Sequence, residues 1–291
     1  MTFWGELRDG SQMLLGRADY AELKREENVP ADLLKLRFPL SVPWPELARI
    51  CAYREGRLIF SGVVDEQNTR LAENGLQTEL VCRSTAALLL DNEAEPAMLE
   101  NPSWRVMVRR YAEPLGFTAA GGEAPAIKGS FAVLKGESCW AALARYAERF
   151  LGGRLGVAEE NRLVYQKTYQ TAVLKGILSA RQIYRPCKQI SCVRVQDGTG
   201  AYASVYRNPK ATVSRERFFS REDSRSPAEY VRLAEEESRL WQVTLAGLPA
   251  AEPGDTVTAE IPLWDQTLTA RVWKMRYVLE PAGEQTELYL K

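Results

Sequence analysis

The amino-acid sequence predicts an α+β fold that is mainly β, with two antiparallel β domains and an α/β middle domain. Apolar and polar residues alternate with a period of two in the first third of the chain and again in the last third. Between these regions the apolar spacing becomes helical. We therefore place the domains at residues 1–84, 85–185 and 186–291, the last with one packed helix.

The first β domain is predicted from its alternation. In residues 31–38 the apolar Leu34, Leu36 and Phe38 share one face, while a lysine and an arginine share the other, as a half-buried strand requires. Residues 48–54 continue the same pattern. These segments predict neighbouring strands of an antiparallel meander.

The segment GRLIFSGVVD, residues 56–65, is predicted to begin a longer strand. Its inward face is expected to carry Leu58, Phe60, Gly62 and Val64. Glu73-Asn74-Gly75 follows as a hairpin signal, because asparagine and glycine accept the positive φ angles of a tight turn. Residues 76–83 then alternate as the returning strand.

The middle domain is predicted from three helical segments, residues 84–96, 102–117 and 136–153. Ser138 is placed to cap the third helix, and two glycines at its end are placed to stop it. The apolar stripe of this helix is expected to contain Trp140, Leu143, Ala144, Ala147 and either Phe150 or Leu151. Residues 153–167 predict a β-hairpin with an acidic turn.

The last third predicts strands with a single helix between them. The strands are expected within residues 189–196, 201–207, 210–219, 241–248, 255–264, 267–279 and 286–290. The helix is expected to start near Ser226-Pro227, with Tyr230, Leu233, Ala234 and Leu240 available for its packed face.

The last 50 residues repeat the strand and turn pattern of the first β domain at a constant offset of 208 residues. Under this offset Gly75 aligns with Gly283. The tetrapeptide Gln-Thr-Glu-Leu at residues 77–80 recurs at residues 285–288. Two unrelated hairpins with similar alternation would explain this equally well, because strand pattern alone constrains face and turn. If the repeat is real, each chain carries two copies of one β domain.

Charge and hydropathy exclude several functions. Lysine plus arginine and aspartate plus glutamate each number 38, so there is no net charge to hold a polyanion and specific nucleic-acid binding is not expected. No run approaches the 18 to 20 apolar residues of a membrane span, and residues 1–10 do not have the pattern of a secretion signal. We therefore expect that the chain does not insert into a membrane and that it is synthesised and folded in a cytoplasm.

The sequence also gives no catalytic, cofactor-binding or metal-binding residue. It contains no histidine, which excludes Ser-His-Asp and Cys-His catalysis and the usual histidine-containing zinc sites. The five cysteines, at 51, 82, 139, 187 and 192, form no Cys-x-x-Cys pair, and Cys139 is expected to be a packed thiol. GTGAYA at 198–203 is expected to be a hairpin turn, because strands rather than a helix follow it. The acidic clusters predict solvated surface.

The strand at 56–65 and the returning strand after it carry a resemblance. Phe60, Gly62 and Val64 match a Phe-x-Gly-x-Val strand core, and Arg83 and Ser84 match a polar step into a short helix. With the middle segment at 134–165, this succession resembles the baseplate hub proteins of contractile phage tails and related injection machines, the late control D superfamily. The chain is shorter than some of these hubs and lacks an appended lysozyme-like or glycine-rich spike segment.

The resemblance implies two β-barrel domains, each similar to a tail tube subunit, and a homotrimer that presents six such barrels. Such a ring would join a hexameric tail tube to a trimeric spike and let DNA or cargo pass. The implied partners are the tail tube and tail spike proteins, with tape measure and baseplate wedge proteins as further candidates. The implied location is the tail baseplate of a virion or a tail-like particle, with synthesis in the cytoplasm of the bacterial host.

Two other functions are kept as alternatives. The first is a cell-wall glycan hydrolase that uses acidic residues of the middle domain, since 38 acidic residues permit a carboxylate pair after folding. The second is a carbohydrate-binding tail module with aromatic stacking platforms. Trp44, Trp104, Trp140, Trp241, Trp264 and Trp273 are scattered along the chain, which favours core and interface roles.

Overall fold

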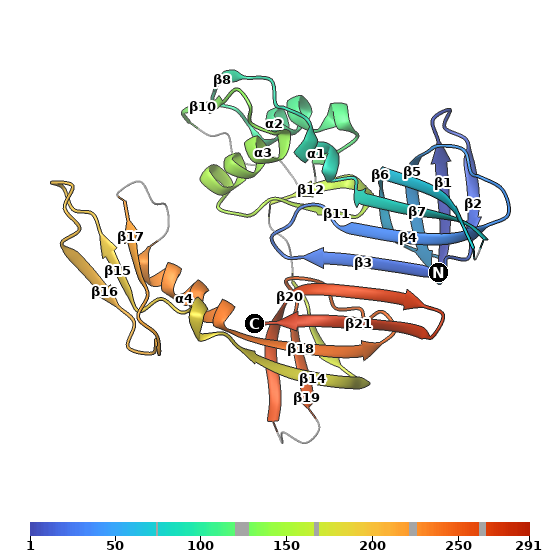
Figure 1. Cartoon of the computed structure of the whole chain (residues 1–291). Helices are drawn as coiled ribbons and strands as arrows, with labels where there is room; N and C mark the ends of the chain where they lie inside the picture. Colours follow the sequence, from blue (N-terminus) through green and yellow to red (C-terminus); the bar gives the residue numbers. More distant parts are fainter. Residues whose placement is uncertain (74, 120–127, 166–168, 221–225, 262–265) are drawn as a thin grey trace. The chain divides into compact units, whose positions relative to one another are not determined.

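The fold is that of a computed structural model, which describes residues 1–73, 75–119, 128–165, 169–220, 226–261 and 266–291. It confirms the expected fold class, because most elements are strands of antiparallel sheets and helices are few (Figure 1). Two compact units are present: Met1–Gln170 with Arg276–Glu284, and Thr171–Met275 with Gln285–Lys291. The three-domain division at 84 and 185 stays a prediction.

The first unit begins with an antiparallel sheet whose strands run in the order β3-β4-β7-β6-β5-β1-β2. The strands are β1 (Thr2–Leu7), β2 (Gln12–Gly16), β3 (Tyr20–Glu26), β4 (Leu33–Leu40), β5 (Leu47–Arg54), β6 (Arg57–Ala72) and β7 (Gly75–Ser84). Leu34, Leu36 and Phe38 of β4 are at most 2% exposed, which confirms the predicted buried face.

The predicted face of β6 is wrong at one residue. Phe60 is 3% exposed, but Leu58 is 46% exposed. The register explains the difference, because Phe60 lies opposite Ala52 while Leu58 lies opposite the next residue, Tyr53. Ile59 is therefore the extra residue of a β-bulge, and the bulge turns Leu58 to the other face of the sheet.

The hairpin after β6 joins β6 to β7 as expected. Gly75 has a φ of +106°, a conformation that glycine adopts readily. Asn74 of the predicted turn lies outside the described residues. Leu80 and Cys82 of β7 are buried, as the alternation predicts.

A helical part with its own core follows in the first unit. Its elements are α1 (Ala87–Asp91), β8 (Ala97–Glu100), α2 (Trp104–Tyr111), β9 (Thr118–Ala119), β10 (Ser130–Val133), α3 (Cys139–Tyr146), β11 (Gly156–Ala158) and β12 (Arg162–Val164). Short 3-10 or π turns span Glu113–Leu115, Ala147–Leu151 and Glu159–Asn161. β11 and β12 form the predicted antiparallel hairpin.

Side-chain caps and an apolar face explain helix α3. The Ser138 hydroxyl accepts a hydrogen bond from Ala141 N, so the predicted cap is confirmed, and the helical segment ends at Gly152 in the left-handed region. Of the predicted stripe, Leu143 and Ala147 are fully buried, whereas Trp140 and Phe150 are half-buried. The stripe omitted Cys139, Ala142 and Tyr146, which the structure buries.

The second unit contains strands and one longer helix. Its elements are β13 (Thr171–Leu174), β14 (Ile177–Tyr184), a 3-10 turn (Pro186–Lys188), β15 (Cys192–Val195), β16 (Ser204–Arg207), β17 (Glu216–Phe219), α4 (Pro227–Ser238), β18 (Arg239–Ala246), β19 (Thr256–Ile261), β20 (Gln266–Glu280) and β21 (Gly283–Leu290). The last part of β20 and the turn after it belong to the first unit.

Helix α4 starts as predicted. Ser226 caps it and Pro227 occupies its first turn, where the missing N–H of proline costs nothing. The helix ends at Ser238, so Leu240 belongs to β18 and not to the packed face of α4. Val231 and Ala234 are the buried apolar residues of that face.

The internal repeat has a structural counterpart. β6 ends at Ala72 and β7 begins at Gly75, while β20 ends at Glu280 and β21 begins at Gly283. Both boundaries differ by the 208 residues of the sequence offset. Both glycines have positive φ values, +106° and +138°. The two hairpins thus share their turn position.

Candidate functional site

The residues that carry the resemblance form the base of the β6–β7 hairpin. Phe60 packs into the core, and Gly62 lies opposite Ser84 in the register. A Cβ atom on Gly62 would lie 2.1 Å from the carbonyl oxygen of Arg83. This position therefore excludes every side chain, because strand β7 passes too close for a methyl group. Val64 is half-buried.

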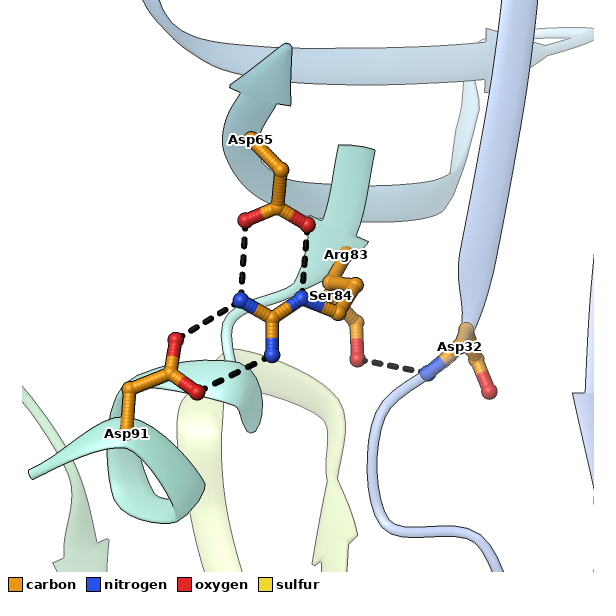
Figure 2. A network of polar contacts seen from close by, with 5 residues as sticks. All are labelled: Asp32, Asp65, Arg83, Ser84 and Asp91. Carbon is orange, nitrogen blue, oxygen red and sulfur yellow. Dashed lines mark hydrogen bonds and ion pairs between the residues drawn. The ribbon is translucent and has the colours of Figure 1, made fainter. Parts of the chain in front are cut away.

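Arg83 joins the hairpin to helix α1 through two carboxylates (Figure 2). Its guanidinium donates to Asp65 of β6 at 2.6 and 2.9 Å and to Asp91 of α1 at 3.0 and 2.7 Å. Both pairs are bidentate, the geometry for which a planar guanidinium is suited. Hydrogen bonds from Arg83 hold the pKa of the Asp91 carboxyl below its usual value, although partial burial opposes this shift.

Ser84 and Thr85 stabilise the same junction through hydrogen bonds of their backbone and hydroxyl groups. Asp32 N donates to the Ser84 hydroxyl at 3.0 Å (Figure 2). Ser84 N donates in turn to Asp32 O at 2.9 Å. Thr85 N donates to Ser61 O at 3.1 Å, and its hydroxyl donates to the Asn161 side chain at 2.6 Å. The motif residues thus fix where the sheet ends and where helix α1 begins.

Replacing Arg83 with methionine is expected to lower the free energy of unfolding by about 1 kcal/mol, since the ion pairs are partly exposed. The pKa of Asp91 is lowered in the folded chain. The stability that its ion pair contributes is therefore fully present above the ordinary pKa of 3.8 and is lost as the pH falls through the pKa of the folded state. The variant should therefore lose less stability on acidification than the parent. Urea unfolding followed across acidic pH measures both effects.

Arg70→Met is the matched control, because Arg70 lies 3.6 Å from Glu79 in an exposed pair. This control should not change stability measurably. Equal losses in the two variants would contradict a structural role for the Arg83 junction.

The sheet also presents a polar face of mixed charge. Across β4, β7 and β6, Lys35 lies opposite Val81, and Val81 lies opposite Glu66. The next row places Arg37 opposite Glu79 and Glu79 opposite Asn68. Cations and anions therefore alternate over this face, and no basic cluster forms in these two rows.

The strands of the second unit present a similar face. Arg181 of β14, Gln242 of β18 and Tyr289 of β21 form one row, and Arg181 donates to the Gln242 side chain at 2.6 Å. Ser179, Thr244 and Glu287 form the next row. The opposite face of these strands is apolar, with Val243 and Leu288 fully buried. Both units thus contain a sheet with one apolar and one polar, charge-balanced face.

Cys139 lies in the helical core, and residues 198–203 lie in a turn between two strands. Cys139 is 6% exposed, and burial raises the pKa of its thiol, which fits the expected packed role. Residues 198–203 connect the antiparallel strands β15 and β16, and Asp197 accepts hydrogen bonds from Thr199 and Ala201 within this turn. The expected hairpin turn is confirmed.

Glu22 of β3 is a buried carboxylate held by two cations. Burial of Glu22 opposes its ionisation, but hydrogen bonds from Lys24 and Arg276 outweigh this effect and lower its pKa. A carboxylate held in this way is a poor general acid. No cluster of acidic and cysteine side chains suited to a metal ion occurs among the residues described. None of the described helices is long and apolar enough to cross a membrane.

The tryptophans are dispersed as the sequence suggests. Trp104 is 2% exposed in the helical core, and Trp44 packs on Phe38 at 4.9 Å between ring centroids. Trp264 lies outside the described residues. Sequence reasoning omitted Trp4, which is 39% exposed on β1, and the alternation of the first six residues could have indicated it.

Sequence reasoning also missed Asp32, Asp65 and Asp91, the partners of the Arg83–Ser84 step. The residues lie far apart in sequence and only folding brings them together. The signal for Asp65 is its place at the end of the GRLIFSGVVD segment, on the strand that the predicted hairpin pairs with Arg83.

Comparison with solved structures shows the fold. The chain is similar to a tail protein from Neisseria meningitidis, with a TM-score of 0.71, 17% identity and coverage of 99% of this chain and 95% of that chain. It is similar to the 43 kDa tail protein of prophage MuSo2 from Shewanella oneidensis, with a TM-score of 0.77, 14% identity and coverage of 100% and 98%.

A third similar structure is a component of the type VI secretion system of E. coli, with a TM-score of 0.52, 10% identity and coverage of 94% of this chain and 73% of that chain. That component is itself described as similar to the bacteriophage T4 tail proteins gp27 and gp5. No protein-family model and no curated protein sequence matches the chain. The chain thus has the fold of tail and secretion-machine proteins over nearly its full length.

Proposed function

We propose that the chain is a structural baseplate hub of a phage tail or of a phage-tail-like contractile particle. The observation that carries the proposal is the pair of hairpins, β6–β7 and β20–β21, whose turns differ by the 208-residue offset. Each hairpin belongs to sheets with one apolar and one polar face. The tail proteins of the same fold support this assignment.

The repeat gives the hub its symmetry. Three chains, each with two similar β domains, present six similar domains around one axis. Such a ring matches a hexameric tail tube on one side and a trimeric spike on the other. We accordingly propose a homotrimer whose partners are the tube and spike proteins, with tape measure and baseplate wedge proteins as further partners. It would lie in the baseplate of the virion or particle.

The polar sheet faces support a passage for DNA or cargo. A surface whose lysine and arginine side chains are spaced to contact successive DNA phosphates binds DNA tightly, and such binding would hinder passage. Faces in which Lys35, Arg37 and Arg181 alternate with acidic or neutral side chains give weak contacts instead. We propose that these faces line the passage. In this role the chain binds and positions other proteins, and no step of the function is catalytic.

The trimer is tested by light scattering with negative-stain imaging of the same sample. Each chain has a mass of 32.7 kDa, so a trimer should have a mass of about 98 kDa and form an open ring. If the purified chain is monomeric, the measurement is repeated with the spike protein present, because a partner can drive assembly. A chain that stays monomeric with the spike protein would contradict the hub proposal.

The two alternatives need their own controls on the same protein. A peptidoglycan zymogram detects a glycan hydrolase, and the hub proposal predicts no cleared zone. A glycan array detects a carbohydrate-binding module, and the hub proposal predicts no bound glycan. Cleavage that is lost when a defined acidic pair is replaced would favour the hydrolase.

A further inference from the structure

The hairpins β6–β7 and β20–β21 occupy the same place in their sheets. Each is followed by two further antiparallel strands, in the orders β6-β7-β4-β3 and β20-β21-β18-β14. The strand on the other side of each hairpin also stops pairing at the same point. β5 pairs with β6 as far as Val63, and β19 pairs with β20 as far as Arg271, which lies 208 residues later. Beyond this point the outer half of each long strand has a free edge unless another strand covers it.

The outer half of β20 is covered within the chain. β20 is next to β3 in the order of strands, and Arg276 of β20 donates to the Glu22 carboxylate of β3 at 2.6 Å. Tyr277 is fully buried, and Leu279 lines a pocket of the first unit together with Phe3. This end of the hairpin is therefore held by the first unit.

The outer half of β6 has no such cover among the described strands, because β6 pairs only with β5 and β7. Under the 208-residue offset, Asn68 and Leu71 are the counterparts of Arg276 and Leu279. Asn68 is exposed, and Leu71 is 80% exposed, more than any other large apolar side chain that the structure describes. An apolar residue thus lies in solvent at a free strand edge, where its repeat counterpart is packed.

The counterpart of β3 is β14, which is also an edge strand (Figure 1). Among the described strands β14 pairs only with β18. Arg181 of β14 lies where Glu22 lies in β3, since both lead through one intermediate strand to residues that are 208 apart. The two rows are Glu22–Lys35–Val81 and Arg181–Gln242–Tyr289. Leu178, the extra residue of a bulge in β14, is 62% exposed.

The end of the β6–β7 hairpin carries more carboxylates than cations. Residues 66–79 contain three glutamates and one arginine, namely Glu66, Glu73, Glu79 and Arg70. Arg70 is already paired with Glu79 at 3.6 Å. Asn68 donates to Glu66 at 2.7 Å and lies opposite Glu79 in the register. The cations of the same rows, Lys35 and Arg37, lie on β4, beyond β7. An arginine that faces Asn68 would therefore meet two carboxylates.

The β14 edge carries the opposite charge. Residues 171–185 contain three cations and no acidic residue, the cations being Lys175, Arg181 and Arg185. The one carboxylate in the two rows around Arg181 is Glu287, which lies on β21, beyond β18. The glutamates of helix α4 precede Arg239, which pairs with Tyr184 and not with the middle of β14. The two free edges thus complement each other in charge.

We propose that the outer half of β6 in one copy of the chain pairs with the β14 edge of a second copy, as the outer half of β20 pairs with β3 within one chain. Leu71 would be covered by the second copy, and Arg181 of that copy would face Asn68. The contact is heterologous, because each copy presents β6 to one neighbour and β14 to the other. The inference rests on the proposed hub function, since closure after three copies gives the trimer.

The first test joins the two edges by a disulfide in the full chain. Asn68→Cys and Arg181→Cys are introduced together, with the exposed Cys187 replaced by serine so that it does not compete. Mild oxidation should give covalent dimers and trimers on a non-reducing gel, and no larger species. The matched control combines Asn68→Cys with Met98→Cys, which changes a 66% exposed residue of β8 and should leave the chain uncrosslinked.

The second test measures association without a crosslink. In light scattering Leu71→Ser should weaken association by about tenfold per contact, whereas Leu58→Ser, in the part of β6 that β5 covers, should not change it. Asn68→Arg and Arg181→Glu should each weaken association. The two together should restore it, because they place at this contact the same residue types that form the Arg276–Glu22 pair.

The outcomes separate this inference from the hub proposal. A parent chain that forms trimers, with no disulfide in the first test and equal association of the Leu71 and Leu58 variants, would overturn the inference and leave the hub in place. A Leu71→Ser variant that forms trimers normally but no longer binds the tube protein would also overturn it, and would assign the hairpin end to that partner. Disulfide-linked species that continue beyond three chains would support the contact but contradict the trimer.

Discussion

Replacing Gly62 with alanine is expected to lower the free energy of unfolding by about 3 kcal/mol. The new methyl group would lie 2.1 Å from the Arg83 carbonyl oxygen, 2.8 Å from the Arg83 carbonyl carbon and 2.7 Å from Cζ of Phe60. Two of these atoms are backbone and cannot rotate away. Strands β6 and β7 would have to separate at the base of the hairpin, and urea unfolding followed by circular dichroism measures the loss.

Gly156→Ala provides the matched control for this prediction. A Cβ atom on Gly156 would lie 3.4 Å from the nearest atom, Cγ2 of Val164, an ordinary contact with a side chain. This variant should stay within about 1 kcal/mol of the parent. Equal stability of the Gly62 and Gly156 variants would show that β6 and β7 do not approach each other so closely.

Replacing Tyr146 with alanine is expected to cost about 4 kcal/mol, because it leaves a cavity in the helical core. The ring is fully buried and contacts Trp104, Phe131 and Phe150 at centroid distances of 6.1, 5.4 and 5.2 Å. Loss of near-ultraviolet circular dichroism and faster amide exchange within residues 87–164 should accompany the lower stability.

Tyr146→Phe separates the ring from its hydroxyl. The hydroxyl donates a hydrogen bond to Pro102 O at 2.6 Å, and its removal leaves that buried carbonyl without this donor. The loss should be about 1 to 2 kcal/mol. If the alanine variant lost no more than the phenylalanine variant, packing of the ring would not stabilise this core.

The strands predicted from the sequence are those in which large apolar residues recur at every second position. In β4 and β7 the burial of Leu34, Leu36 and Leu80 follows directly from position. β1 and β3 were not predicted, because each buries one residue that is not typical of a core beside apolar ones. Gly5 is buried in β1 against Leu47, and Glu22 is buried in β3 by its ion pairs. A single sequence cannot distinguish such residues from exposed ones.

Bulges and long-range partners limited the prediction further. The extra residue Ile59 reverses the side on which Leu58 lies, and only the pairing with β5 reveals it. Arg83 was predicted as part of a motif, but its role depends on Asp65 and Asp91, which lie 18 and 8 residues away. Turns and caps were recovered more reliably, because Ser138, Ser226 and Gly75 act through their own neighbours.

Strand β20 is shared between the two units of the chain. Residues 266–275 of this strand belong to the second unit, whereas Arg276–Glu284 belong to the first. Neither unit is therefore a continuous piece of the gene. A recombination event with one breakpoint near residue 170 would separate the first unit from a strand segment that carries Tyr277, a fully buried residue. Exchange of a unit between homologous chains would instead have to replace both units together, or use additional breakpoints around residues 275 and 285.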